Sequence, residues 1–165
     1  MIIRLHDGDL PLKEHQTNLL FSAINFFAEK LIDVARRKEI QINVFFENRS
    51  AKDVCGEVSH LIKKSFLEKQ RQFNMVLSKN LKPIDMLKAI AHEMVHIKQA
   101  VTGELLFLLN KTRSAYKTYW KGSKRYNKAS PPWEEEAYRV ETELYISFLH
   151  HFRQITHSGK TCPHF

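Results

Sequence analysis

The sequence predicts an α+β fold, because two kinds of hydrophobic periodicity alternate along the chain. Segments 12–38, 83–102 and 133–152 place apolar residues three or four positions apart, which is typical of amphipathic helices. Segments 40–47 and 71–78 alternate apolar and polar residues and are rich in residues that favour strands. We therefore expect helices packed against a small sheet.

The scaffold is expected to begin with a long helix from Leu12 to Lys38, which ends in basic residues that complement the helix dipole. The stretch from Val54 to Ile62 is ambiguous, and a strand across Gly56 to Ile62 is preferred. With the two alternating segments, it would form a small, mostly antiparallel sheet. The apolar run Leu105 to Leu109 is expected to be a helical turn or a core-packed loop.

The helix expected from Pro83 to Thr102 contains the motif His92-Glu93-Met94-Val95-His96. A proline suits the first turn of this helix, and Gly103 suits its C-terminal stop. One face carries an apolar stripe that would attach the helix to a core, formed by Leu87, Ile90, Met94, Ile97 and Val101. The two histidines fall on a different face, so we expect them to line a cleft.

This spacing favours a metal site. Residues four apart project from one helical face, so both imidazoles can reach one Zn²⁺ at roughly 2.0–2.1 Å. Glu93 follows the first histidine and could act as a general base on a metal-activated water, which would then attack a peptide carbonyl. The alternative is that the motif is accidental and that His92 and His96 lie on an ordinary solvated helix face.

A catalytic zinc ion usually takes three protein ligands, so a third ligand is expected downstream. The longer three-histidine motif is excluded, because Gln99 and Thr102 stand where it needs glycine and histidine. The helix from Trp133 to Phe152 opens with three acidic residues after two prolines. Of these we expect Glu136 to be the ligand, because it precedes Ala137 and shares a helix face with Val140 and Glu143-Leu144. Glu134 and Glu135 are left as candidates for orienting a ligand histidine.

The central motif, together with Pro132-Trp133-Glu134 and Glu136-Ala137, resembles the small zincins of the gluzincin type. It is similar to the SprT-like metallopeptidases and to metallopeptidases encoded in phage genomes, over roughly Arg71 to Glu143. This resemblance implies a minimal zincin-like fold in which two histidines and the later glutamate bind zinc and the motif glutamate is catalytic. It also implies that Arg71–Ser78 forms the upper rim of the cleft, where an extended substrate adds as a further strand.

Cysteine usage departs from the SprT-like pattern. Many members carry a C-terminal zinc ribbon built on four cysteines, whereas this chain has only Cys55 and Cys162. DNA binding by such a ribbon is therefore not expected, and one domain is expected over residues 1–165. Two distant cysteines also suit a reducing compartment.

The formal net charge is +8, which favours acidic partners such as nucleic acid. Basic and aromatic residues interleave over residues 111–128, and this segment supplies the candidate nucleic-acid contacts Lys117, Lys121, Lys124 and Arg125. Tyr126 is a candidate hydrogen-bond donor to the oxyanion of the transition state. The alternative is a solvated hairpin whose aromatic residues pack on the core.

Two functions are therefore consistent with the sequence. The first is a zinc-dependent metallopeptidase acting on a protein or peptide, and the second is a zincin-like module that binds nucleic acid or protein and has a structural or vestigial metal site. The chain has neither an apolar run of about eighteen residues nor the pattern of a signal peptide, so no membrane association is expected. We expect a cytoplasmic protein, in the host cytoplasm if phage-encoded.

Overall fold

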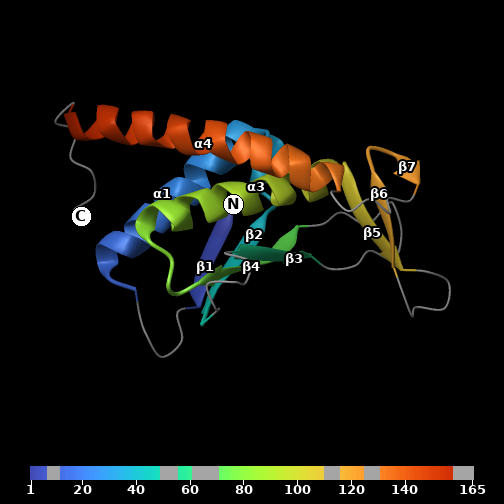
Figure 1. Cartoon of the computed structure of the whole chain (residues 1–165), viewed down its shortest axis with the longest axis horizontal. Helices are drawn as coiled ribbons and strands as arrows, with labels where there is room; N and C mark the ends of the chain where they lie inside the picture. The colour runs from blue at the N-terminus through green and yellow to red at the C-terminus, as the bar shows by residue number, and fades with distance from the viewer. Residues whose placement is uncertain (7–11, 49–55, 61–70, 110–115, 125–130, 158–165) are drawn as a thin grey trace.

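The computed structural model describes residues 1–6, 12–48, 56–60, 71–109, 116–124 and 131–157. Over these residues the fold is α+β, with helices on one face of a four-stranded sheet and a three-stranded sheet beside them (Figure 1). In chain order the elements are β1 (Ile2–His6), α1 (Glu14–Leu31), α2 (Val34–Arg37), β2 (Gln41–Glu47), β3 (Gly56–His60), β4 (Gln72–Ser78), α3 (Pro83–Thr102), β5 (Leu105–Leu109), β6 (Tyr116–Trp120), β7 (Ser123–Lys124) and α4 (Pro132–His157).

The four-stranded sheet has the order β1-β2-β4-β3, and its pairing corrects the predicted topology. β1 pairs parallel to β2 and β2 pairs parallel to β4, so only β3 runs antiparallel. The expectation of a mostly antiparallel sheet was wrong because β1 was not predicted and because β4 pairs parallel to β2. Helix α1 returns the chain to the end of the sheet where β1 began, which makes the next strand parallel.

The position of β4 gives a second correction. β4 is hydrogen-bonded to β2 on one side and to β3 on the other, so it cannot be the rim strand that the family resemblance implied. The terminal strand beside β4 is β3, within the expected stretch from Gly56 to Ile62, and β1 is the terminal strand at the opposite edge. The helix nearest to β3 is α3, which carries the central motif.

The long N-terminal helix is interrupted. α1 ends at Leu31, Ile32 is extended and 3% exposed, and Asp33 caps the short helix α2 by accepting a hydrogen bond from the backbone N–H of Arg36 at 2.9 Å. The cap competes with a continuous helix because it satisfies a backbone donor locally. The predicted span from Leu12 to Lys38 is therefore two helices.

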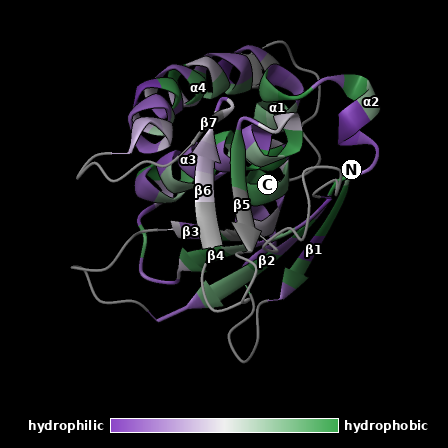
Figure 2. Ribbon diagram, turned by 90° about the vertical axis from the view of Figure 1, so that its right-hand side faces the viewer, coloured by the Kyte–Doolittle hydropathy of each residue, from purple (hydrophilic) through white to green (hydrophobic). Residues whose placement is uncertain are grey.

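The run from Leu105 to Leu109 is a strand rather than a helical turn or a loop. It pairs antiparallel with β6, and β6 pairs with β7 (Figure 2). The pattern of five consecutive apolar residues did not distinguish these structures, because a short apolar run suits a strand or a helix equally. A partner strand eleven residues later decides the outcome.

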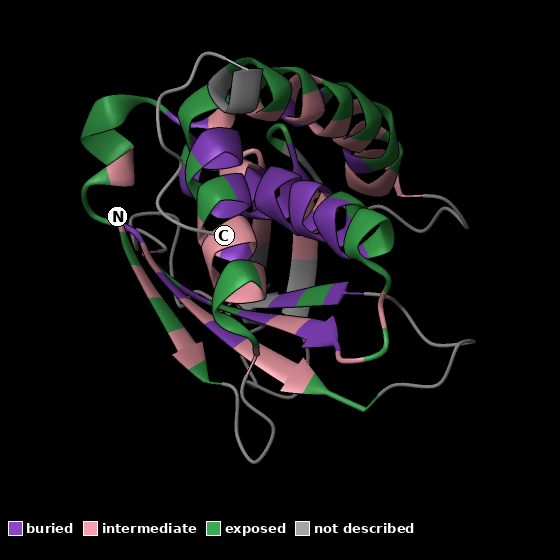
Figure 3. Ribbon diagram, turned by 90° about the vertical axis from the view of Figure 1, so that its left-hand side faces the viewer, coloured by how far each residue is buried: buried purple, intermediate pink, exposed green. Residues whose placement is uncertain are grey.

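Helix α3 occupies the centre of the core, as predicted for the span from Pro83 to Thr102. It contacts α1, α4, the four-stranded sheet and β5, and most of its residues are buried (Figure 3). The inward side chains of the sheet meet it from below, among them Val44, Phe73, Met75 and Leu77. Among the described residues, no helix combines the length and apolar character of a membrane span.

Phe27 provides a test of this packing. Its ring is fully buried and lies 5.6 Å from the ring of Phe148, so it joins α1 to α4. We expect Phe27→Ala to lower the free energy of unfolding by about 3–5 kcal/mol, measured by chemical denaturation. Ile146→Ala, at a position 49% exposed on α4, is the control and should change stability by less than about 1 kcal/mol. Equal losses in the two variants would contradict the packing described.

Candidate metal centre

The site forms where α4 crosses α3. His92 and His96 lie one turn apart in the middle of α3, and Glu134 lies in the first turn of α4. The face of α4 directed toward the core is marked by buried Ala137 and Leu144. Glu134 is three residues before Ala137, so the packing of this face carries the Glu134 carboxylate to the histidines.

Three ligand atoms meet at nearly equal distances. The Nε2 atoms of His92 and His96 are 3.1 Å apart, and Glu134 Oε2 lies 3.2 Å from the first and 3.3 Å from the second. Atoms that bind a tetrahedral zinc ion at about 2.0–2.1 Å are about 3.3–3.4 Å apart. The triangle therefore has nearly the size that one ion requires, and these residues form a cluster that could hold a metal.

Glu141 fixes the proton of His92. Its Oε2 lies 2.8 Å from Nδ1 of His92, and an ionised carboxylate only accepts hydrogen bonds. Nδ1 of His92 must therefore donate, which leaves Nε2 of the neutral ring with its lone pair directed toward the cluster. A carboxylate behind a histidine in this way is a common partner of metal-binding imidazoles.

Gln99 does the same for His96. Its Nε2 donates to the backbone oxygen of Trp133 at 3.0 Å and to Glu136 Oε2 at 2.9 Å, both of which accept only. Its Oε1 therefore faces His96 and accepts a hydrogen bond from Nδ1 at 2.9 Å. Nε2 of His96 is again left with a lone pair.

The result is a cluster of three acceptors with no donor among them when both rings are neutral. Three converging lone pairs at 3.1–3.3 Å repel one another unless a proton or a cation lies between them. Two imidazoles and a carboxylate form a donor set that suits a zinc ion. The chemistry of the residues thus fits a divalent cation.

The pKa values show the competition with protons. Burial disfavours protonation of His92 and His96, but Glu134 and the neighbouring carboxylates outweigh it, so the pKa of each imidazole is raised. Hydrogen bonds from His92 and His96 lower the pKa of Glu134 to about 2. Without a metal, protons on the histidines hold the cluster together, and a metal ion must displace them.

Glu93 lies beside this cluster and is only 3% exposed. Burial raises the pKa of its carboxyl group, and the charges of His96 and His92 work in the opposite direction. β3 approaches Glu93 closely at Gly56. A Cβ atom at this position would lie only 3.1 Å from Oε1 of Glu93, which is closer than side-chain Cβ atoms usually come to another atom. The backbone N–H of Val58 also donates toward this carboxylate.

The choice of Glu136 as the third ligand is corrected. Glu136 is about 200° around α4 from Glu134 and binds Gln99 and Lys121 instead of the histidines. Glu134 and Glu135 had both been candidates for orienting a ligand histidine. Glu134 instead lies in the cluster itself, and Glu135 is exposed. The sequence prediction had relied on the face that Glu136 shares with Val140, which is only partly buried.

Three further contacts were missed from the sequence. Glu141 lies seven residues after Glu134 and so on the same face of α4, a spacing that could have identified it. Tyr138 lies between them, with its ring centroid 4.8 Å from that of His92. The hydrogen bond that Gln99 makes to His96 was not predicted.

The candidate nucleic-acid contacts have mixed outcomes. Lys121 is engaged within the protein, since its Nζ lies 3.2 Å from Glu136 Oε1 and 4.8 Å from the centroid of the Trp120 ring. Lys117 and Lys124 belong to β6 and β7, but their side chains lie outside the described part of the structure. Arg125 and Tyr126 lie wholly outside the described residues, so the roles given to them stay predictions.

Removing the carboxylate of Glu134 tests the cluster. We expect Glu134→Ala to weaken Zn²⁺ binding by more than about 100-fold. Loss of a residue that only hydrogen-bonds to a ligand costs about 10–100-fold, and this variant removes a ligand itself. The affinity would be measured by competition with a chromogenic chelator. Glu135→Ala removes an exposed neighbouring carboxylate of the same helix turn and should leave the affinity within about twofold. Similar losses in both variants would exclude Glu134 as a ligand.

The affinity should also depend on pH. Because the pKa of each histidine is raised above 6.5, protons occupy the ligand atoms below those raised values. Zn²⁺ binding should therefore be strongest at alkaline pH and should weaken as the pH falls, by about tenfold per pH unit for each proton displaced. Titrations from about pH 9 to about pH 6 would measure this slope. An affinity that is constant over this range would show that the histidines are not ligands.

Comparisons with protein-family models, with curated proteins and with solved structures returned no match for this chain. The chemistry of the site therefore rests on its own geometry.

Proposed function

We propose that the protein is a zinc-dependent metallopeptidase with a zincin-like fold. His92, His96 and Glu134 would hold the zinc ion, and Glu93 would act as the general base. The observation that carries the proposal is the triangle of three acceptor atoms, with edges of 3.1–3.3 Å, beside a buried carboxylate. The bound ion would polarise the scissile carbonyl and increase the acidity of water at the site.

Glu93 supplies the proton chemistry. Its raised pKa lies closer to neutral pH, where a carboxylate can accept a proton from water and later return it to the leaving amine. Burial also excludes bulk water from this carboxylate and would strengthen its interaction with charges that develop at the site during the reaction. Both properties follow from the packing of Glu93 between α3 and β3.

The position of β3 favours a peptide as the substrate. β3 is one of the two terminal strands of the four-stranded sheet, and Gly56 and Val58 lie directly against the proposed general base. An extended peptide that pairs with a terminal strand is fixed by backbone hydrogen bonds. Pairing with β3 would place a peptide bond close to Glu93, which favours hydrolysis of a polypeptide in extended conformation.

A module with a purely structural metal is the alternative. Such a site gives no reason to bury Glu93, because an ionised carboxylate removed from water is costly unless it is paired. Among the described residues, those that act on the Glu93 carboxyl include the two histidines, Glu134 and the N–H of Val58, and none of these four is a lysine or an arginine. Lys121, one of the residues on which nucleic-acid binding was predicted, forms an ion pair with Glu136 while its side chain stays 52% exposed.

The variant Glu93→Gln separates catalysis from metal binding. It keeps the shape of the side chain but cannot accept a proton, so peptide hydrolysis should fall by at least about 100-fold. Zn²⁺ stoichiometry should stay unchanged, since Glu93 is not a ligand. Activity would be followed by mass spectrometry of an unfolded protein and of a mixed peptide library, with Glu135→Gln as the control for loss of a nearby charge. Undiminished hydrolysis by Glu93→Gln would refute the mechanism.

A further inference from the structure

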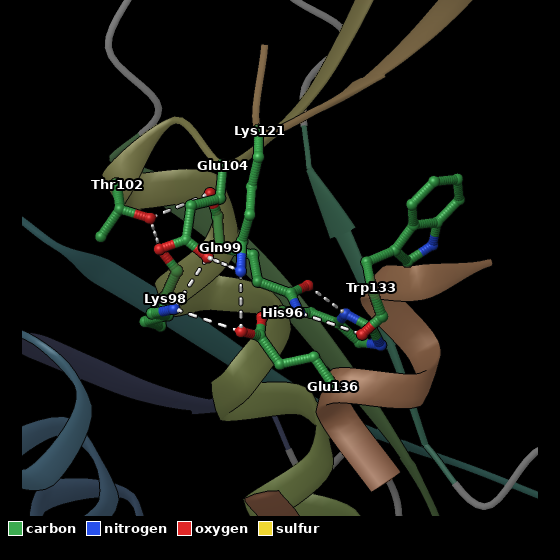
Figure 4. A network of polar contacts seen from close by, with 8 residues as sticks. All are labelled: His96, Lys98, Gln99, Thr102, Glu104, Lys121, Trp133 and Glu136. Carbon is green, nitrogen blue, oxygen red and sulfur yellow. Dashed lines mark hydrogen bonds and ion pairs between the residues drawn. The ribbon is translucent and has the colours of Figure 1, made fainter. Parts of the chain in front are cut away.

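A chain of polar contacts leads from His96 to the turn between β6 and β7 (Figure 4). It starts at Gln99, which is fully buried and accepts from the His96 ring. It continues through Glu136, whose Oε2 accepts from Gln99. It ends at Lys121, whose Nζ donates to Oε1 of the same carboxylate. The first step lies within α3, and the next two reach α4 and the turn after β6, so the contacts link α3, α4 and the second sheet.

The side-chain amide of Gln99 determines the tautomer of His96, because the amide can adopt two orientations. In the observed one its oxygen faces His96, which requires a proton on Nδ1 and leaves Nε2 open. In the reversed one its NH₂ group would face Nδ1 of His96, which would move the ring proton to Nε2 and block the ligand atom. Two acceptors oppose the reversed orientation, because the amide oxygen would then face the backbone oxygen of Trp133 at 3.0 Å and the Glu136 carboxylate at 2.9 Å. Of these, only Glu136 contributes a side chain and a negative charge.

We propose that Gln99 and Glu136 are positioning residues for the metal centre. They select the tautomer of His96 that presents Nε2 to the ion. This inference rests on the proposed metallopeptidase function, since it explains how one of the ligands is prepared. It also assigns a role to the glutamate that the sequence had suggested as a ligand.

The surrounding charges support this role. Lys121 donates to Glu136, and Lys98 Nζ lies 3.9 Å from the same carboxylate. These two ammonium groups and the NH₂ group of Gln99 stabilise the ionised form of the Glu136 carboxylate. An ionised carboxylate accepts hydrogen bonds and donates none, which is the property that fixes the amide of Gln99.

The simpler explanation is that this network only fastens the second sheet to the helices. Glu104 allows the two explanations to be separated, because it shares both lysines with Glu136. Its Oε2 lies 2.8 Å from Lys98 and 4.0 Å from Lys121. The described contacts of Glu104 are to these lysines and not to Gln99, and its side chain is 24% exposed against 17% for Glu136. Glu104 is thus a matched control.

The experiment compares Zn²⁺ affinity in Glu136→Met, Glu104→Met and Glu136→Gln. We expect Glu136→Met to weaken binding about tenfold or more, as is usual for residues behind a ligand, and Glu104→Met to leave it within about twofold. Glu136→Gln keeps an oxygen that can accept from Gln99, so it should restore most of the affinity. Equal losses in Glu136→Met and Glu104→Met would overturn the proposal, as would a Glu136→Gln loss as large as that of Glu136→Met.

A double-variant cycle tests whether the two residues act through one path. Gln99→Met removes the acceptor for His96 directly and should weaken Zn²⁺ binding about 10–100-fold. Combining it with Glu136→Met should cost no more than Gln99→Met alone, because Glu136 acts only through Gln99. Losses that simply add would contradict the proposal. Thermal unfolding of each variant shows whether it is folded under the assay conditions.

Nitrogen NMR of the His96 ring in the metal-free protein gives an independent measurement. At a pH above the raised pKa, the neutral ring should carry its proton on Nδ1 in the wild type and in Glu104→Met, and should shift toward Nε2–H in Glu136→Met. The same tautomer in all three proteins would overturn the inference. This arm does not need a bound metal, so absence of Zn²⁺ binding by the wild type would reject the proposed function separately.

Discussion

The packing of α4 across α3 is the interaction on which the candidate site depends. α3 supplies both histidines, and α4 supplies the groups around them. Glu134 and Glu141 contact His92, and the Trp133 carbonyl and Glu136 hold Gln99. Glu134 and Glu141 lie two turns apart on one face of α4, and His92 lies between their carboxylates. Because buried Ala137 and Leu144 fix the rotation of this helix, a change in that rotation would alter all of these contacts together.

This arrangement combines a well-packed core with a group of acceptor atoms that repel one another. The face of α3 opposite the histidines is buried against the sheet and α1, which fixes the helix rigidly. Three acceptor atoms at 3.1–3.3 Å can then be maintained, since the backbone that carries them cannot easily separate. Protons satisfy the cluster at low pH, and the proposed metal ion would do so at higher pH. Energy from packing thus offsets repulsion at the site.

The second sheet has a defined connection to the site. β5 packs against the C-terminal part of α3, and the turn after β6 brings Lys121 to Glu136. Basic residues in this region suggested nucleic-acid contacts when only the sequence was considered. The structure shows that one of these charges, Lys121, neutralises a carboxylate close to the histidines. Charge counts along a sequence do not distinguish a binding surface from an internal ion pair, because the partner of each charge depends on tertiary packing.

The metal-centre residues were only partly predictable. His92, Glu93 and His96 could be placed because a helix brings residues four apart to the same face, whatever surrounds it. The choice between Glu134 and Glu136 depended on how α4 is rotated. The periodicity of its first turn was misleading, since both faces carry apolar residues and acidic groups. Gln99 and Glu141 were missed for a related reason, because their roles exist only across a contact between two helices.

The sequence by itself determined the α+β class, the span of α3 from Pro83 to Thr102, and the spacing of its two histidines and glutamate. These features depend on local periodicity and on helix start and stop residues, which act within a few positions of the chain. The tertiary structure alone decided the parallel pairing of β1, β2 and β4, the terminal position of β3 and the selection of Glu134. The parallel pairings and the selection of Glu134 depend on contacts between residues more than thirty positions apart, and β3 pairs with β4 across 13 to 21 positions. The free energy of such contacts is not encoded in any local pattern.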